Sequence, residues 1–242
     1  YQAAAADKLL YEHAAVSELS EGQKWVRHEK AARAMAEHQD AYDALFTVWE
    51  SQSWIDDLQR QHKIVVRYIQ AGEVKQPNPW ANSVGAVTSK RYMLKLLETY
   101  SKTDPSAPVP IVERACVAIV SELGTAVVTF KLGPIKKQSR VFEKVLSNDG
   151  HFDMIRDYAR GTFIVKRVDV LPRLLAELLL ADDFTVIRAK NRLSNGWDSR
   201  DSAGYRDYQL LVRTKEGWIV ELQLIPEGMH ALKEKLGHTD YV

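Results

Sequence analysis

The chain has 242 residues and a formal net charge of +1, with 33 Lys and Arg residues against 32 Asp and Glu residues. This length is enough for one large or two modest domains, and the balanced charge excludes the overall basic signature of a long nucleic-acid groove. Cys116, the single cysteine, excludes an internal disulfide and a cysteine zinc site, so we expect a small buried side chain there. No apolar run approaches the roughly 20 residues of a membrane span, so no membrane partner is expected. Because the sequence starts at Tyr1 rather than Met, we expect a fragment of a longer protein.

Residues 1–103 are predicted to form a helical region. They are rich in Ala, Glu, Gln, Lys and Leu, and apolar residues recur at helical spacing, with helices expected over 54–69 and 83–100. No pair of histidines has metal-binding spacing here. We interpret this half as a helical bundle without chemistry of its own, which could bind a protein partner such as an antitoxin. The proline-rich segment 104–110 is the predicted linker to the rest of the chain.

Basic residues gather after a helix predicted at 111–123 and an apolar, β-branched run at 125–132. Lys136, Arg140 and Lys144 recur every four residues, which predicts one helical face. Like charges at this spacing repel one another, a cost that a bound polyphosphate would remove. From this stretch alone, a polyphosphate site and a solvated cationic helix are equally good interpretations.

Strands and a helix alternate over the next sixty residues. Asp157 and Arg160 precede a predicted strand at 162–166, and Gly161 permits a tight entry into it. A helix is expected at 170–181, a strand at 184–189 and a polar loop at 190–203. The order of elements predicts an α+β fold, with a mixed β-sheet flanked by helices.

A hairpin is predicted from strands at 205–214 and 218–225, joined by the turn 215–217. Glu221 and Gln223 are two residues apart, so they point to one face of the strand, whereas Val220, Leu222 and Leu224 point to the other. A carboxylate and an amide beside an apolar core face suit a metal or nucleotide site. The alternative interpretation is an ordinary solvated strand face.

Six short motifs follow one another in a familiar order. They are Lys136-x-x-x-Arg140-x-x-x-Lys144, Asp157-Tyr-Ala-Arg160-Gly161, Lys190-Asn-Arg192, Gly204-Tyr205-Arg206-Asp207, Val220-Glu221-Leu222-Gln223 and Gly237-His238-x-x-Tyr241. Over residues 110 to 242 this series resembles the RelA/SpoT synthetase domain, a nucleotidyltransferase-like pyrophosphokinase that makes guanosine alarmones. Each motif alone is weak, and their order is what carries the resemblance.

The resemblance implies an enzyme that transfers pyrophosphate from ATP to the ribose 3′-hydroxyl of a nucleotide, with GDP or GTP as the first expectation. It implies Mg²⁺ as cofactor, held by the catalytic residues Asp157 and Glu221. The implied ATP-phosphate ligands are Lys136, Arg140, Lys144 and Arg160. The implied acceptor-binding residues are Lys190, Arg192, Tyr205, Arg206, Gln223 and His238.

The chain also departs from the family pattern. Pro134 stands where an arginine is usual, Thr162 stands where a further arginine would fall, and Asp207 begins the segment that is commonly Ser-x-His. These variants resemble the toxin-type or small stand-alone branch. The acceptor therefore stays open among guanosine nucleotides, adenosine nucleotides and the tRNA 3′ end, and a degenerate, nucleotide-binding regulatory domain is the alternative. We expect the chain in the cytoplasm, or in that of a target cell if it is an effector.

Overall fold

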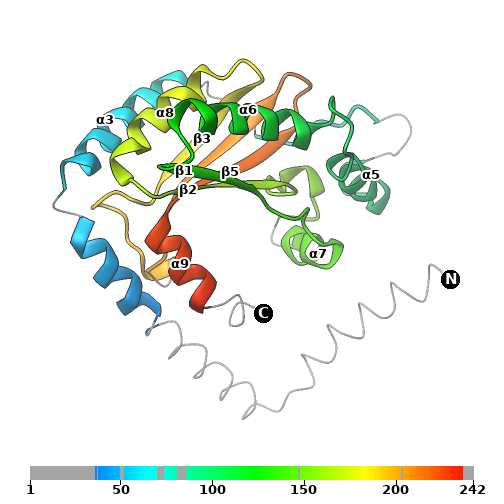
Figure 1. Cartoon of the computed structure of the whole chain (residues 1–242). Helices are drawn as coiled ribbons and strands as arrows, with labels where there is room; N and C mark the ends of the chain where they lie inside the picture. The colour runs from blue at the N-terminus through cyan, green and yellow to red at the C-terminus, as the bar shows by residue number, and fades with distance from the viewer. Residues whose placement is uncertain are drawn as a thin grey trace, which may run out of the picture.

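The computed structural model describes residues 36, 38–49, 52–69, 74–80, 86–146, 148–202 and 204–236. In chain order the elements are α3 (Ser53–Tyr68), α5 (Lys90–Tyr100), α6 (Pro108–Leu123), β1 (Val128–Leu132), α7 (Gln138–Leu146), the short 3-10 helix η1 (Phe152–Met154), β2 (Arg160–Val165), η2 (Val168–Val170), α8 (Leu171–Leu180), β3 (Phe184–Asn191), η3 (Arg200–Ser202), β4 (Tyr208–Thr214), β5 (Ile219–Pro226) and α9 (Glu227–Leu236). Residues 38–49 are also helical. Figure 1 shows helices on both sides of one sheet, which confirms the predicted α+β class.

The five strands form a mixed sheet in the order β1-β2-β5-β4-β3. β2 and β5 pair in parallel, and the other neighbours pair antiparallel. In the parallel pair, Arg160 lies opposite Glu221 and Thr162 lies opposite Gln223. Every residue of β5 is buried, so this central strand is covered on both faces. The predicted placement of Glu221 and Gln223 on one face of the strand is confirmed by this register.

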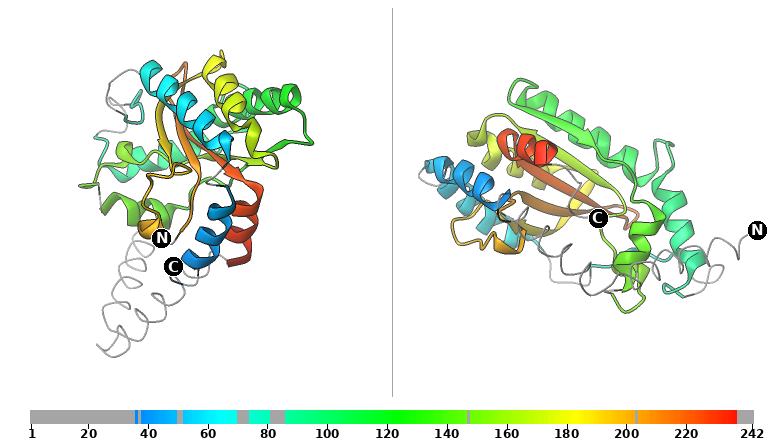
Figure 2. Two further views of the ribbon diagram at one scale, coloured as in Figure 1. Left: turned by 90° about the vertical axis from the view of Figure 1, so that its left-hand side faces the viewer. Right: turned by 90° about the horizontal axis from the view of Figure 1, so that it is seen from below.

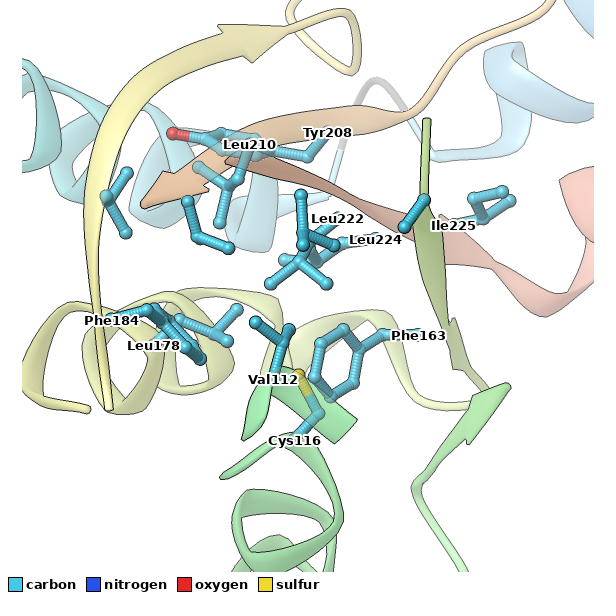
Figure 3. Packing of buried hydrophobic residues seen from close by; sticks show 14 of the residues in the cluster. Val112, Cys116, Phe163, Leu178, Phe184, Tyr208, Leu210, Leu222, Leu224 and Ile225 are labelled. Atoms are coloured by element: carbon cyan, nitrogen blue, oxygen red, sulfur yellow. The ribbon is translucent and has the colours of Figure 1, made fainter. Parts of the chain in front are cut away.

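The main core lies between the sheet and the helices α3, α6 and α8 (Figure 1). In Figure 3, Val112 and Cys116 of α6 point toward Phe163 of β2 and toward Leu222 and Leu224 of β5. All five side chains are fully buried, in agreement with the apolar reading of Cys116 and of the inner face of β5. Packing of this kind stabilises a domain through the apolar area that it removes from water.

The segment before α6 belongs to the same core. Tyr100 donates a 2.6 Å hydrogen bond to the carbonyl of Ile219, and its ring stacks on Tyr158 with centroids 5.7 Å apart. The backbone amide of Ile219 donates to Gln76 Oε1 at 3.2 Å. Because the two hydrogen bonds to Ile219 join residues more than a hundred positions apart, the described part of 1–103 packs on the start of β5.

Two predicted boundaries differ in the structure. The linker expected at 104–110 ends at Ala107, because Pro108–Pro110 form the first turn of α6, where proline is well tolerated. The helix expected at 83–100 begins at Lys90, with the Ser89 side chain accepting from the Tyr92 amide as its N-cap. Among the described residues, no helix combines the length and the apolarity needed to cross a membrane.

The helix of residues 38–49 lies beside α9. Both views in Figure 2 show the two helices next to each other at the side of the sheet. Side chains of Leu45 and Trp49 lie so near Gly228 of α9 that an added Cβ would be 3.1 Å and 3.6 Å from them. The helix also packs on Gly204, where an added Cβ would come within 2.8 Å of Gln39 and Tyr42. This contact brings the N-terminal part of the chain to the predicted acceptor side.

Replacing Gly161 by alanine is expected to lower the free energy of unfolding by about 1–3 kcal/mol. A Cβ at this position of β2 would lie 2.5 Å from the Phe130 ring and 3.0 Å from Leu222, so both side chains would have to shift. Urea unfolding of the variant measures the loss. Gly196→Ala is the matched control, because a Cβ there meets nothing within 4 Å. Equal stability of the two variants would contradict the close packing of β2.

Candidate active site

Asp157 and Glu221 reach the same cleft from two neighbouring segments of the chain. Asp157 lies just before β2, Glu221 lies on β5, and the parallel pairing of these strands brings the two carboxylates to one side of the sheet. Both residues line a cleft of about 300 Å³. The basic side chains that line the same cleft are Lys144, Arg156, Arg188 and Lys190.

The carboxylate of Asp157 is buried under three cations. Its Oδ2 atom lies 2.7 Å from Lys144 Nζ, 2.9 Å from Lys136 Nζ and 3.1 Å from an Arg160 guanidinium nitrogen. Burial alone would raise the pKa of Asp157, but Lys144 and Lys136 outweigh it and hold the pKa below its ordinary value. Asp157 is therefore an anion at neutral pH.

Glu221 has a different environment, although it is equally buried. The Nε atom of Arg160 lies 2.6 Å from Glu221 Oε1. The two groups form an ion pair without the alignment of a hydrogen bond, so Oε1 has no hydrogen-bond partner among the described residues. Burial raises the pKa of Glu221, and Arg160 only partly opposes it. Such a carboxylate can accept a proton at a pH nearer neutrality than an exposed one.

Arg160 bridges the two carboxylates, since its guanidinium contacts Asp157 and its Nε contacts Glu221. Burial would lower the pKa of Arg160, but the two carboxylates raise it further than burial lowers it. With Lys136 and Lys144, three cations face two carboxylates, which leaves one net positive charge. The centre of the cleft is thus suited to an anionic substrate.

The predicted basic helical face is only partly present. Lys136 lies in the loop before α7, where its amide donates to the carbonyl of Tyr158 at 2.9 Å, so the prediction that it shares a helix with Arg140 and Lys144 is wrong. Lys136 and Lys144 still converge, because both contact Asp157. Arg140 is exposed and donates to Glu143 at 2.6 Å. A loop that folds back on β2 produces this convergence, and helical periodicity does not detect it.

Of the residues predicted to bind the acceptor, the structure groups Tyr205 with Arg192, and both contact Asp207. The Tyr205 hydroxyl donates to Asp207 Oδ2 at 3.1 Å, and Arg192 Nε donates to Asp207 Oδ1 at 2.7 Å. The Arg192 guanidinium lies 5.6 Å from the centroid of the Tyr205 ring. Asp207 is completely buried and holds both side chains in place. The sequence placed Asp207 in the motif Gly204-Tyr205-Arg206-Asp207 and noted it as a departure from the family pattern, but assigned it no role in the site.

The other predicted acceptor residues lie apart from one another. Lys190 lines the cleft, with its ammonium 4.3 Å from the centroid of the Trp197 ring. Gln223 is buried on β5 opposite Gln209. Arg206 places its guanidinium 4.0 Å from the Phe46 ring and lines a second cavity of about 310 Å³ instead of the cleft. His238 lies outside the described residues.

Three basic residues of the site were not singled out from the sequence as site residues. Arg156 and Arg188 line the cleft, and Lys233 of α9 places its ammonium 5.4 Å from the centroid of the Tyr205 ring. Arg188 lies two residues before Lys190 on β3, so strand alternation could have found it. Nothing in the pattern of α9 marks Lys233, because only the fold brings this helix to Tyr205.

The carboxylate pair fits Mg²⁺ by its donor chemistry. Among the described residues, no group of three or more His, Cys, Asp or Glu side chains could hold a metal ion. Mg²⁺ commonly takes only one or two protein carboxylates and completes its octahedron with substrate phosphates and water. The three cations on Asp157 all contact Oδ2, and Oδ1 is the oxygen that Mg²⁺ could share.

No protein-family model matches the chain, and no curated protein matches it. Several solved structures match the chain. The type VI effector Tas1 in complex with its immunity protein matches at 22% identity over 55% of this chain, with a TM-score of 0.42. Small alarmone synthetase 1 from Bacillus subtilis bound to its product pppGpp matches at 18% over 58%, with a TM-score of 0.42. A GTP pyrophosphokinase family protein from Streptococcus pneumoniae matches at 18% over 60%, with a TM-score of 0.45.

The match spans 61% of the effector's chain and 77% of each of the other two. The names of the second and third proteins, an alarmone synthetase and a GTP pyrophosphokinase family protein, are of the class that the six motifs resemble. Their identities and TM-scores are low, so the chemistry of this chain is inferred from the residues of its own cleft.

Proposed function

We propose that this chain is a Mg²⁺-dependent pyrophosphokinase that transfers the β,γ-pyrophosphoryl group of ATP to the ribose 3′-hydroxyl of a nucleotide, GDP or GTP first. The observation that carries the proposal is the pair Asp157 and Glu221, bridged by Arg160 in one cleft beside Lys136 and Lys144. An anionic carboxylate, a carboxylate of raised pKa and a net positive charge suit metal binding, proton transfer and charge stabilisation in this chemistry.

The donor side consists of the cations around Asp157. Lys136 and Lys144 contact this carboxylate from the loop before α7 and from α7 itself, so their ammonium groups share one place in the cleft. A triphosphate bound there would form charge-assisted contacts with these two ammonium groups. Mg²⁺ held by Asp157, with Glu221 alongside, would supply further positive charge to the transferring group. Arg160 would remain to hold Glu221 in position.

Glu221 supplies the acid–base step. Its carboxylate takes the proton of the ribose 3′-hydroxyl as that oxygen forms a bond to the β-phosphorus of ATP. The bond between the β-phosphorus and the α,β-bridging oxygen breaks, and AMP leaves with that oxygen. Arg160 Nε lies 2.6 Å from Glu221 Oε1, so the guanidinium would hold the carboxylate in position for the hydroxyl. The lysines and Arg160 offset the charge on the pyrophosphoryl group during transfer.

The test is incubation of the purified chain with Mg²⁺ and γ-labelled ATP, alone and with GDP, GTP, ADP or deacylated tRNA. Label on one acceptor together with AMP release would establish transfer and identify the acceptor. ATP binding without transfer to any of them would favour the regulatory, nucleotide-sensing alternative. Absence of both ATP binding and transfer would reject the proposed function.

Replacing Tyr205 by alanine is expected to weaken the acceptor by roughly 1–3 kcal/mol, the usual range for base stacking on an aromatic side chain. The expectation follows from the family resemblance, which assigns Tyr205 to the acceptor base, and from the Arg192 guanidinium 5.6 Å from the centroid of its ring. Steady-state kinetics should show a raised KM for the acceptor and an unchanged KM for ATP. Tyr205→Phe is the matched control, because it keeps the ring and removes only the bond to Asp207. An unchanged acceptor KM in the alanine variant would refute the stacking role.

A further inference from the structure

Lys233 is a basic residue of the site that lies outside the six predicted motifs. It belongs to α9, which follows β5 directly and contacts both β2 and β5. Its ammonium lies 5.4 Å from the centroid of the Tyr205 ring. The helix therefore places a cation beside the ring that is proposed to stack on the acceptor base. The charges of Arg160 and Glu221 act on Lys233, whereas Lys136 and Lys144 contact Asp157.

The charge of Lys233 is not neutralised by contact within the described part of the chain. Arg192, the other cation at the Tyr205 ring, is paired with the buried Asp207 at 2.5 Å. No carboxylate of the described residues lies within ion-pair distance of the Lys233 ammonium, although this side chain is half-buried. Burial lowers the pKa of Lys233 and the positive charge of Arg160 lowers it further, while Asp207, Glu234 and Glu221 oppose the shift without cancelling it. A desolvated ammonium is stabilised most by a ligand that brings negative charge.

The identity of that anion follows from the two neighbours of Lys233. Tyr205 would stack on the acceptor base, and Glu221 would receive the proton of the acceptor 3′-hydroxyl. The triphosphate of the donor has its own cations on the Asp157 side of the cleft. The phosphates of the acceptor are then the anionic groups that would lie near Tyr205, where Arg192 is paired with Asp207 and Lys233 is not in ion-pair contact with a carboxylate of the described residues.

We propose that Lys233 binds the 5′-phosphate groups of the acceptor and thereby selects a free nucleoside di- or triphosphate over an unphosphorylated nucleoside or a tRNA end. This inference rests on the proposed pyrophosphate transfer, which defines donor and acceptor. Loss of one charge-assisted contact of this kind reduces affinity by roughly 10- to 100-fold.

Equilibrium binding tests the inference without turnover. The chain is saturated with Mg²⁺ and α,β-methylene-ATP, whose bridging bond cannot be cleaved, and is then titrated calorimetrically with guanosine, GMP and GDP, and with the matching adenosine series. Wild type should bind the diphosphate of the preferred base more tightly than the nucleoside. Lys233→Met should weaken the diphosphate roughly 10- to 100-fold and change the nucleoside by less than about twofold.

Lys235→Met is the matched control, since Lys235 is exposed on the same helix, and it should bind every ligand as wild type does. Lys233→Arg should restore part of the affinity for the diphosphate. An equal loss for nucleoside and diphosphate in Lys233→Met, no loss for either, or no diphosphate binding by wild type would overturn the role of Lys233.

The labelled-ATP assay distinguishes failure of the proposed pyrophosphate transfer from failure of the proposed role of Lys233. Transfer by wild type with no selective defect in Lys233→Met would reject the role of Lys233 and leave the proposed function standing. A selective loss of diphosphate binding in Lys233→Met, with no transfer by wild type to any acceptor, would support the phosphate contact and reject the enzymatic function.

Discussion

Glu221→Gln is expected to reduce turnover by roughly 10²- to 10⁴-fold, the usual contribution of a general base, and to leave ATP binding intact. The amide has the size of the carboxylate and cannot take the proton of the 3′-hydroxyl. It also cannot form an ion pair with Arg160, although Arg160 keeps its contact with Asp157. Because burial raises the pKa of Glu221, the wild-type rate should rise with pH at values above the ordinary pKa of glutamate, and the variant should lose this dependence.

The measurement is single-turnover transfer with γ-labelled ATP, combined with titration of the ATP analogue. Glu216→Gln is the matched control, since Glu216 is exposed in the turn that leads to the same strand. Near-wild-type turnover of Glu221→Gln would remove Glu221 from the acid–base step. Loss of ATP binding in Glu221→Gln would instead assign Glu221 to the donor site.

Asp157→Asn is expected to reduce turnover by roughly 10²-fold or more and to destabilise the fold by about 1–3 kcal/mol. The variant leaves three cations facing one another where the carboxylate now holds them. The estimate lies below the cost of breaking a fully buried ion pair because the Lys144 side chain is half exposed, and water screens its charge. Thermal unfolding with and without Mg²⁺ and ATP measures both effects. Ligand should stabilise the variant less than wild type.

The stability difference between Asp157→Asn and wild type should depend on pH. The pKa of Asp157 lies below the ordinary value of 3.8, so its stabilisation is present above that value and is lost as the pH falls through the lower, folded pKa. The two proteins should therefore become similar in strong acid. Asp183→Asn, an exposed position after α8, should show neither the destabilisation nor this convergence. A difference that stayed constant with pH would place the effect outside the Asp157 ion pairs.

The sequence predicted the strands of the site better than its loops. Alternation on β5 placed Glu221 and Gln223 on one face and Leu222 on the other, and the pairing with β2 confirms it. Strand alternation is local, so it can be recognised from a few residues. The family motifs added Asp157, whose position at the start of β2 no periodicity would single out.

The contacts that the sequence did not predict are long-range. The bridge that Arg160 forms between the two carboxylates was not predicted, because it depends on the parallel register that sets Arg160 opposite Glu221. Lys233 and Asp207 meet at Tyr205 only after α9 and the segment before β4 are in place. In the same way, Gln76 and Tyr100 reach Ile219 across most of the chain. Such contacts depend on topology, which local patterns do not encode.

The position of β5 has a consequence for when the chain could become active. β5 is the last strand of the described residues, yet it lies between β2 and β4, so the two antiparallel pairs β1-β2 and β3-β4 cannot join before it is inserted. Before β5 is synthesised, a ribosome would already have made Asp157, Lys136 and Lys144, and the unfinished sheet would have two unpaired edges. The strand that completes the sheet is also the strand that carries Glu221. Assembly of the domain and the onset of its chemistry would thus be one event, so a nascent chain could bind nucleotides prematurely but could not turn them over.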